Sequence, residues 1–221
     1  MNLGMPRPAR PVPRDDKGGC CVAVLVSGSG TNLQAILDAE HAGKLGATVR
    51  LVLSNKPDAF ALERARNASV RAEHVSTATE GSVDAVGRKM LTLFAEEKID
   101  LVVLAGYLKL LPSEVVRAYR RRIINIHPAL LPKFGGKGMY GLNVHRAVLE
   151  AGEKVSGASI HFVDEIYDHG AVVAQRTVPV EDGDTPERLQ ARVLTIEHQL
   201  LPETIARLAA GEIPLGQMPE G

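Results

Sequence analysis

Tryptophan is absent from this sequence, and its only two cysteines stand side by side at positions 20 and 21. Adjacent cysteines make a poor structural cross-link and lack the spacing of a metal site, so they favour a reducing, cytoplasmic location over a disulfide-stapled secreted fold. No apolar run approaches the roughly 18 residues that a membrane-spanning helix needs. The arginines near the start are not followed by an apolar segment, so we expect no signal peptide.

A net charge of either sign is missing as well, because 26 Lys and Arg balance 26 Asp and Glu. The chain as a whole has no electrostatic field suited to nucleic acid, and the basic triplet at 120–122 is interpreted as a solvated helix end. What is present is an ordinary globular composition, with 45% hydrophobic and 24% charged residues among 221. That length can bury a sizeable core and is typical of one domain. We expect small-molecule ligands, no nucleic-acid or membrane partner, and a monomer or a homodimer.

Residues 1–19 contain four prolines, several charges and almost no apolar periodicity. Such a composition cannot build a core, so we predict a flexible N-terminal tail. From Cys21 the pattern changes, and residues 20–216 form the predicted domain.

Apolar runs alternate with helical stripes over the first 130 residues. Strands are predicted at 21–26, 47–53, 101–104 and 123–126. Asp58 is expected to cap a short helix that ends at Arg66, and Ser113 to cap another. The apolar stripe of a third helix is Val83, Val86, Met90, Leu93 and Phe94. This alternation predicts a doubly wound, mostly parallel α/β sheet.

The C-terminal part departs from this alternation. Residues 158–163 alternate between polar and apolar, a turn follows at 168–170, and a second β run occupies 171–180. This pattern predicts an antiparallel addition at one side of the sheet. Thr185 and Pro186 then open a final helix, with Thr as the cap and Pro at the first position. The expected fold is a single α/β domain with an antiparallel C-terminal addition.

A glycine-rich turn, Ser27 to Asn32, joins the first buried strand to the first helix. Backbone N–H groups and the helix dipole favour a phosphate at such a turn, although a tight turn that binds nothing has the same glycines. A dinucleotide fits badly, because Leu33 replaces the third glycine of G-x-G-x-x-G and the second strand ends in Ser54-Asn55 and not in an acid. A monophosphate is therefore the predicted ligand.

Asn125 and His127 lie at the end of a buried strand, and Pro128 stops that strand. Alternate residues of a strand point the same way, so an amide and an imidazole are presented together. The carboxyl end of a parallel strand is where open α/β sheets bind ligands. An isolated histidine is more often a satisfied core residue, but this combination favours a catalytic site.

Ser159 and His161 share one face of the alternating strand, and Asp164, Glu165 and Asp168 follow in the adjoining turn. A carboxylate near a histidine raises the imidazole pKa and fixes its orientation, as a general acid at neutral pH requires. Which acid reaches which histidine stays open at this point. Asp164 and Glu165 also fit ordinary turn acids.

Glu197 falls on the apolar face of the last helix, eight residues after Leu189 and beside the stripe residues Val193, Ile196 and Leu200. A carboxylate there is costly unless it is paired or binds a cationic ligand. An edge residue that reaches solvent is the alternative. The histidines show no H-E-x-x-H, paired C-x-x-C or tight His/Asp spacing, so we expect no metal site.

Six segments carry a more specific signal. They are VLVSGSGTNLQAI, LVLSNKPDAFALERA, LVVLAGYLKLL, IINIHPALLPKF, GASIHFVDEIYDHGAVVAQ and RVLTIEHQLLP. Together they resemble the phosphoribosylglycinamide formyltransferase family, in the family's order, over roughly residues 21–205. NIHPALLP marks the wider formyltransferase group, and GSGTNLQ with EHQLLP narrows the resemblance to this family.

The resemblance implies transfer of a formyl group from the co-substrate 10-formyltetrahydrofolate to the amine of glycinamide ribonucleotide, without a metal. The implied catalytic trio is Asn125, His127 and Asp168, with Ser159 and His161 behind it. The implied ribonucleotide-binding residues are Gly30, Thr31, Asn32, Leu194, Thr195, Ile196 and, at the amine, Glu197. The implied folate pocket is Leu108, Lys109, Leu110, Leu111, Asn125, Asp164, Glu165, Ile166, Tyr167 and Asp168.

The implied chemistry is direct attack of the amine on the formyl carbon. Asn125 would donate to the tetrahedral oxyanion, and a protonated His127, held charged by Asp168, would stabilise it and help to protonate the leaving folate nitrogen. Two features depart from some family members. Val83 stands where some carry a folate-contacting arginine, and the loop FGGKGMYGLNVH after Lys133 is longer than in the shortest members, with glycines typical of a mobile lid.

Three other functions are alternatives to this one. A 10-formyltetrahydrofolate hydrolase shares the NIHP segment but is expected to carry an extra N-terminal domain, and a methionyl-tRNA formyltransferase a further C-terminal one. A non-catalytic phosphometabolite-binding module would leave Asn125, His127 and Asp168 without a role.

Overall fold

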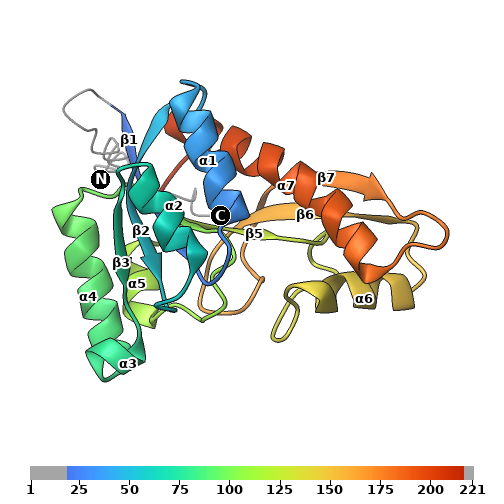
Figure 1. The fold of residues 1–221 in the computed structure, drawn as a ribbon, viewed down its shortest axis with the longest axis horizontal. Helices are drawn as coiled ribbons and strands as arrows, with labels where there is room; N and C mark the ends of the chain where they lie inside the picture. The colour runs from blue at the N-terminus through green and yellow to red at the C-terminus, as the bar shows by residue number, and fades with distance from the viewer. Residues whose placement is uncertain (1–18, 217–221) are drawn as a thin grey trace, which may run out of the picture.

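Seven strands form one sheet in the order β3-β2-β1-β4-β5-β6-β7 in the structure, a computed structural model that describes residues 19–216 (Figure 1). The strands are β1 Cys20–Val26, β2 Ala47–Ser54, β3 Arg71–His74, β4 Leu101–Leu104, β5 Ile123–His127, β6 Val155–Phe162 and β7 Val172–Pro179. The helices are α1 Thr31–His41, α2 Phe60–Asn67, α3 Thr77–Glu80, α4 Val83–Glu96, α5 Ser113–Ala118, α6 Leu142–Glu150 and α7 Pro186–Ala209. The predicted tail at 1–19 lies, except for Gly19, outside the described residues and stays a prediction.

β1 to β5 are parallel, while β6 and β7 are antiparallel additions at one edge. The predicted doubly wound, mostly parallel α/β sheet with an antiparallel C-terminal addition is therefore confirmed. Both faces of β1 are covered, which explains its unbroken apolar sequence. Val22 and Val24 belong to a core shared with α1, α2 and α7, whereas Ala23 and Leu25 belong to a second core shared with α4 and α5.

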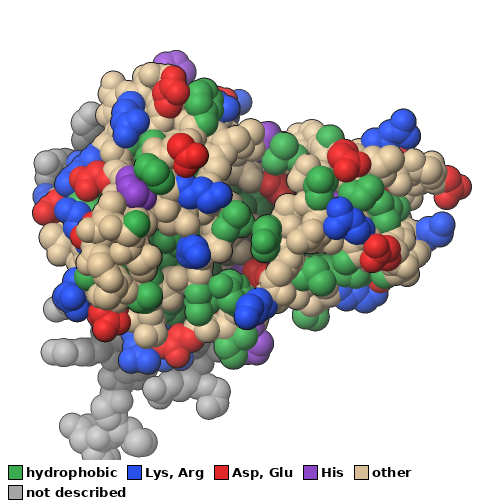
Figure 2. Space-filling view, turned by 60° about the horizontal axis from the view of Figure 1, so that its bottom comes forward, with side chains coloured by type: hydrophobic (Ala, Val, Ile, Leu, Met, Phe, Trp, Pro, Cys, Tyr) green, Lys and Arg blue, Asp and Glu red, His purple; other side chains and the backbone are tan. Residues whose placement is uncertain are grey.

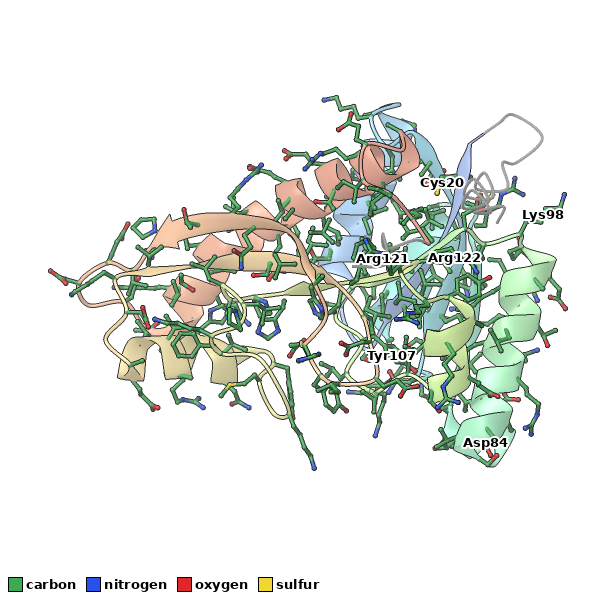
Figure 3. All side chains as sticks on the ribbon, turned by 180° about the vertical axis from the view of Figure 1, so that it is seen from behind. Cys20, Asp84, Lys98, Tyr107, Arg121 and Arg122 are labelled. Carbon is green, nitrogen blue, oxygen red and sulfur yellow. The ribbon has the colours of Figure 1, made fainter. Side chains whose placement is uncertain are left out.

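The strand order leaves a crevice at the carboxyl ends of β1 and β4. β1 is flanked by β2 on one side and by β4 on the other, so the connections after β1 and β4 leave the sheet in opposite directions. Open α/β sheets bind ligands at such a position. In Figure 3, Tyr107, which follows β4, lies at this end of the sheet, and Cys20, which begins β1, lies at the other.

The antiparallel part adds a second wall to the crevice. β6 pairs with β5 so that His161 lies opposite Asn125 and Ser159 lies opposite His127. Figure 1 shows β6, β7 and α6 extending away from the parallel part, and α7 packs along α1, β6 and β7. The space-filling view shows a groove between the larger body and this extension (Figure 2).

The predicted cap at Asp58 is wrong. α2 begins at Phe60, with Ala59 in the cap position and no side-chain cap. The Ala59 N–H donates to the carbonyl of Lys56. This turn places Asp58 before the helix, where its carboxylate does not reach the first free N–H groups.

Ser113 is not a cap either, whereas the predicted cap at Thr185 is confirmed. The Val115 N–H donates to the Pro112 carbonyl, so Pro112 is the cap residue and Ser113 is already helical. The Thr185 side chain accepts a hydrogen bond from the Arg188 N–H at the start of α7.

Two surface interpretations also change. Val83 is 57% exposed in the first turn of α4, so the buried stripe of this helix starts at Val86. The basic triplet follows the end of α5 as expected, but only Arg120 of it is exposed. The Arg121 guanidinium lies 4.7 Å from the ring centre of Phe162, and that of Arg122 lies 4.3 Å from the ring centre of Tyr119. Guanidinium groups stack well on aromatic faces.

Three elements of the structure were not predicted from the sequence: β3, α3 and α6. β3 is a four-residue edge strand of sequence RAEH, which has no apolar alternation to reveal it. α6 begins at Leu142, inside the segment interpreted as a glycine-rich loop. Its buried residues Val144 and Val148 are four apart and give the helical signal that the preceding glycines obscured.

Candidate active site

A cavity of about 410 Å³ opens at the carboxyl ends of the parallel strands. Its walls come from the turn after β1, the loop after β4, the end of β5 with the loop that follows, the β6–β7 turn, α6 and α7. The cavity therefore occupies the crevice that the strand order creates.

Most of the predicted site residues line this cavity. They are Thr31, Asn32, Leu108, Lys109, Leu110, Leu111, Asn125, His127, His161, Asp164, Ile166, Tyr167, Asp168, Leu194 and Glu197. The predicted residues outside its lining are Gly30, Ser159, Glu165, Thr195 and Ile196. The Glu165 carboxylate accepts a hydrogen bond from Arg117 over 2.9 Å, and the Thr195 hydroxyl donates to the Ala191 carbonyl over 3.0 Å. These two side chains are thus engaged elsewhere.

Gly30 shapes the turn before α1 without lining the cavity. Its φ of 73° lies in the left-handed region that favours glycine, and a Cβ there would lie 2.5 Å from the Cβ of Ala61. The close approach to α2 brings the start of α1, with Thr31 and Asn32, to the cavity wall. The free N–H groups of a helix N-terminus are an anion site, which is the geometry that a phosphate requires.

Glu197 projects from α7 into the cavity beside this turn. It is only 7% exposed, and the Asn32 amide donates to its carboxylate over 2.7 Å. Burial raises the pKa of Glu197 to about 6, and the hydrogen bond from Asn32 opposes part of this rise. A ligand N–H or O–H donor at this carboxylate would favour its charged form.

Four polar side chains form the centre of the cavity. The Asn125 amide nitrogen lies 3.0 Å from His161 Nε2 and donates to Asp168 Oδ1 over 3.3 Å. His161 Nδ1 lies 2.9 Å from the Phe162 carbonyl oxygen. Because a carbonyl only accepts, Nδ1 carries the proton of neutral His161, and Nε2 is the acceptor for Asn125. This arrangement fixes the orientation of the Asn125 amide.

His127 is held by groups on both ring nitrogens. Nε2 lies 2.8 Å from the Phe134 carbonyl oxygen, and Nδ1 lies 3.5 Å from Asp168 Oδ2. The carbonyl acceptor keeps the proton of the neutral ring on Nε2. Nδ1 is then the nitrogen that can exchange a proton beside Asp168.

The net pKa shift of His127 is opposite to the expectation from sequence. Burial lowers the pKa of His127, and Asp168 and the Phe134 carbonyl raise it only in part. Burial alone would raise the pKa of Asp168, but His161, His127 and the Gly136 N–H together lower it. The expectation that Asp168 keeps His127 charged is therefore wrong for the ligand-free protein. The resting pair is a neutral imidazole beside a carboxylate.

The glycine-rich loop after Lys133 closes against this pair. The Gly136 N–H donates to Asp168 Oδ2 over 3.0 Å. A Cβ at Gly135 would lie 2.6 Å from Leu131 Cδ2 and 3.1 Å from the Cβ of Asp168, so a side chain there would require these neighbours to shift. Asp168 itself has a φ of 53°, which is uncommon for a residue with a side chain.

Several residues that line the cavity are not among the predicted site residues, for example Tyr107, Met139, Tyr140, His145 and Gln190. His145 on α6 is 1% exposed, and burial lowers its pKa to about 4. Recognition of α6 would have found it, because it lies next to the buried Val144. Burial raises the pKa of Tyr107 to about 12, so this phenol stays protonated.

The sequence profile of the formyl transferase family matches residues 21–205. The chain belongs to the formyl transferase family. Among its relatives, phosphoribosylglycinamide formyltransferase of Escherichia coli (strain K12) is 42% identical over 88% of this chain and 89% of its own length. The chloroplastic phosphoribosylglycinamide formyltransferases of Vigna unguiculata and Arabidopsis thaliana are 44% and 43% identical over 87% of this chain, which spans only 62% and 66% of their lengths.

Solved structures of formyl transferases agree with this fold. Glycinamide ribonucleotide transformylase 1 from Symbiobacterium toebii matches with a TM-score of 0.83 and 42% identity over 90% of this chain and 91% of its own. The resemblance inferred from the six sequence segments is confirmed. Among residues 19–216 of this formyl transferase, no helix is long and apolar enough to cross a membrane, and no group of three His, Cys, Asp or Glu side chains could hold a metal ion.

Proposed function

We propose that this protein transfers the formyl group of 10-formyltetrahydrofolate to the amine of glycinamide ribonucleotide, a step of purine biosynthesis. One observation carries the proposal: the Asn125–His127–Asp168 centre and the Asn32–Glu197 pair line the same cavity. The first group suits acyl transfer, and the second suits a phosphorylated amine or sugar. A site that transfers an acyl group to a phosphorylated amine needs both groups of residues.

The ribonucleotide would occupy the end of the cavity formed by α1 and α7. Its phosphate would bind the N–H groups at the start of α1, at Gly30, Thr31 and Asn32. Glu197 would accept hydrogen bonds from the amine or the sugar hydroxyls. These hydrogen bonds would lower the raised pKa of Glu197 toward its ordinary range. Leu194 lies one turn before Glu197 on the cavity wall.

The folate would occupy the part of the cavity formed by the loop after β4 and the β6–β7 turn. Large apolar side chains, Leu108, Leu110, Ile166 and Tyr167, are between 42% and 61% exposed and line the cavity. Exposed apolar surface of this kind favours an aromatic ligand. Val83 supplies no charge for the folate carboxylates, whereas Lys109 of the lining does.

The amine nitrogen attacks the formyl carbon, a new C–N bond forms, and the carbonyl oxygen becomes an oxyanion. The Asn125 amide donates a hydrogen bond to that oxygen. In the ligand-free protein the same amide contacts His161 and Asp168, and the charged oxyanion competes with these two groups for its N–H donors. Nδ1 of the neutral His127 accepts the proton that the amine loses. It then donates this proton to the folate nitrogen as the old C–N bond breaks. Asp168 stabilises the imidazolium between the two steps.

No resident metal takes part in these steps, and both partners are small molecules. We include a cytoplasmic location, which rests on the adjacency of the two cysteines in the sequence, and a monomeric or homodimeric state in the proposal.

The test is to follow folate release and formylated ribonucleotide with the full chain and 10-formyltetrahydrofolate, with and without glycinamide ribonucleotide. We expect tetrahydrofolate to appear only with the amine, in equal amount to the formylated product. Equal folate release without the amine would establish a hydrolase instead. Binding of the ribonucleotide without any turnover would leave only a phosphometabolite-binding module.

A further inference from the structure

Two polar side chains of the antiparallel strands hold the loop that follows His127. Ser159 of β6 is fully buried, and its hydroxyl donates to the Ala129 carbonyl over 2.6 Å and accepts from the Leu131 N–H over 3.0 Å. Gln175 of β7 donates to the Ser159 hydroxyl over 2.8 Å and to the Leu131 carbonyl over 3.0 Å.

These contacts replace a strand ladder. β5 ends at His127, so the backbone groups of Ala129 and Leu131 lack strand partners and are satisfied by side chains instead. Buried backbone polar groups need such partners. Gln175 is the residue that ties this loop to the next strand, because its amide bonds both the loop carbonyl and the hydroxyl that holds the loop.

The held loop carries the group that orients His127. Phe134 lies three residues after Leu131, and its carbonyl oxygen lies 2.8 Å from His127 Nε2. Two residues further, the Gly136 N–H donates to Asp168 Oδ2 over 3.0 Å. The position of this short segment therefore decides which His127 nitrogen carries the proton and how Asp168 points.

We propose that Gln175 is a positioning residue for His127, acting through Ser159 and residues 129–134. Gln175 does not line the cavity and so does not touch the substrates. Its donated hydrogen bonds fix the Phe134 carbonyl, which in turn keeps Nδ1 of His127 free for proton transfer. The catalytic consequence rests on the proposed formyl transfer, whereas the effect on the His127 ring does not.

The test is Gln175→Met, which keeps the length of the side chain and removes both N–H donors. We expect turnover to fall by roughly 10- to 100-fold, as for a small misplacement of a reacting group. The KM values of both substrates should change much less, because the cavity walls are untouched. ¹⁵N NMR of the His127 ring should show loss of the single Nε2–H tautomer. Gln199→Met is the matched control, since Gln199 is an exposed α7 residue that accepts from Arg176.

Ser159→Ala keeps the proposal testable if Gln175→Met folds poorly. It removes the hydroxyl through which Gln175 holds the loop, so the His127 ring of Ser159→Ala should lose the single Nε2–H tautomer as well. Where Gln175→Met does fold, the double variant should be little slower than Ser159→Ala alone. An unchanged His127 spectrum in folded Gln175→Met would overturn the proposal whatever the turnover. A loss of melting temperature with unchanged turnover would assign Gln175 to stability alone. If the wild-type protein transfers no formyl group, the proposed function fails, and the His127 spectrum still decides the positioning role.

Discussion

Asn32 donates a hydrogen bond over 2.7 Å to Glu197, which lies 165 residues further along the chain. This contact joins the start of α1 to the middle of α7 and places an amide and a carboxylate at one end of the cavity. The carboxylate is buried without an ion-pair partner among the described side chains. The protein keeps a destabilising charge there, as binding sites often do.

Glu197→Gln should stabilise the ligand-free protein at neutral pH. The pKa of Glu197 is raised from 4.5 to about 6 in the folded protein, so the folded state binds this proton more tightly than the unfolded chain. Stability must then fall as pH rises between these values and stay lower above them. Removing the charge should raise the free energy of unfolding by about 1–2 kcal/mol at pH 7.5 and by much less at pH 4.

Urea unfolding at both pH values measures this difference, with the exposed Glu63→Gln on α2 as the control. An equal gain at pH 4 and pH 7.5 would mean that the charge of Glu197 is not the cause. Calorimetric titration of the same variant should show weaker ribonucleotide binding and unchanged folate binding. If neither affinity changes while stability rises, Glu197 is only a buried acid.

Gly30→Ala and Gly28→Ala should separate the two glycines of the turn. A Cβ at Gly30 would meet Ala61 at 2.5 Å and adopt a φ of 73°, whereas a Cβ at Gly28 would have nothing within 4 Å. We expect Gly30→Ala to lower the free energy of unfolding by roughly 1–3 kcal/mol, and Gly28→Ala by less than about 1 kcal/mol. Thermal unfolding of both variants is the measurement. Equal losses would contradict a special role for Gly30.

The sequence predicted the parallel sheet because burial on both faces leaves a clear trace: apolar runs such as that of β1, each ending in a turn. It predicted Asn125 and His127 because a strand's two-residue period puts them on one side. Helix starts were predicted less well. Asp and Ser often cap helices, but the local backbone hydrogen bonds place the caps at Ala59 and Pro112 and not at Asp58 and Ser113. The spacing of Val144 and Val148 places His145 on the buried side of α6, but that this side lines the cavity depends on how α6 packs in the fold.

The direction of the His127 pKa shift shows a different limit. The sequence indicates which charges are near, and it correctly indicated a carboxylate, but it does not indicate how much hydration the ring loses. His127 is 3% exposed, and this burial outweighs Asp168 at 3.5 Å. The net pKa shift of His127 is a sum of opposing effects of similar size, so its direction can be worked out only from the three-dimensional structure.

Asn125→Ala should fold normally and lose roughly 10²–10³-fold in turnover, as for removal of an oxyanion donor. The structure adds a second expectation, because the amide also contacts His161 Nε2 and Asp168 Oδ1. The His161 resonances should therefore shift in the ligand-free variant. Steady-state kinetics with both substrates and an NMR spectrum check the two effects. Unchanged turnover with weaker folate binding would show that Asn125 only positions the ligand.

Asp168→Asn should lower the pKa of His127 further. Burial already lowers it, and Asp168 is the main group that opposes this effect. Asparagine keeps the shape and removes the charge, so the imidazolium loses its partner at 3.5 Å. The NMR titration of His127 should have its midpoint at lower pH than in the wild type. Asp182→Asn, fully exposed and paired only with Lys154, should leave this midpoint unchanged.

Turnover should respond as well, because the proposed proton transfer passes through the imidazolium. We expect Asp168→Asn to lose roughly 10²–10⁴-fold, and His127→Ala a similar amount. The acidic limb of the kcat/KM profile, where the resting His127 becomes protonated and stops accepting the amine proton, should move to lower pH in Asp168→Asn. The double variant should be little slower than either single one, since residues that act as a unit do not add. Strictly multiplicative losses, or an unshifted His127 titration, would contradict the pairing even if both residues proved essential.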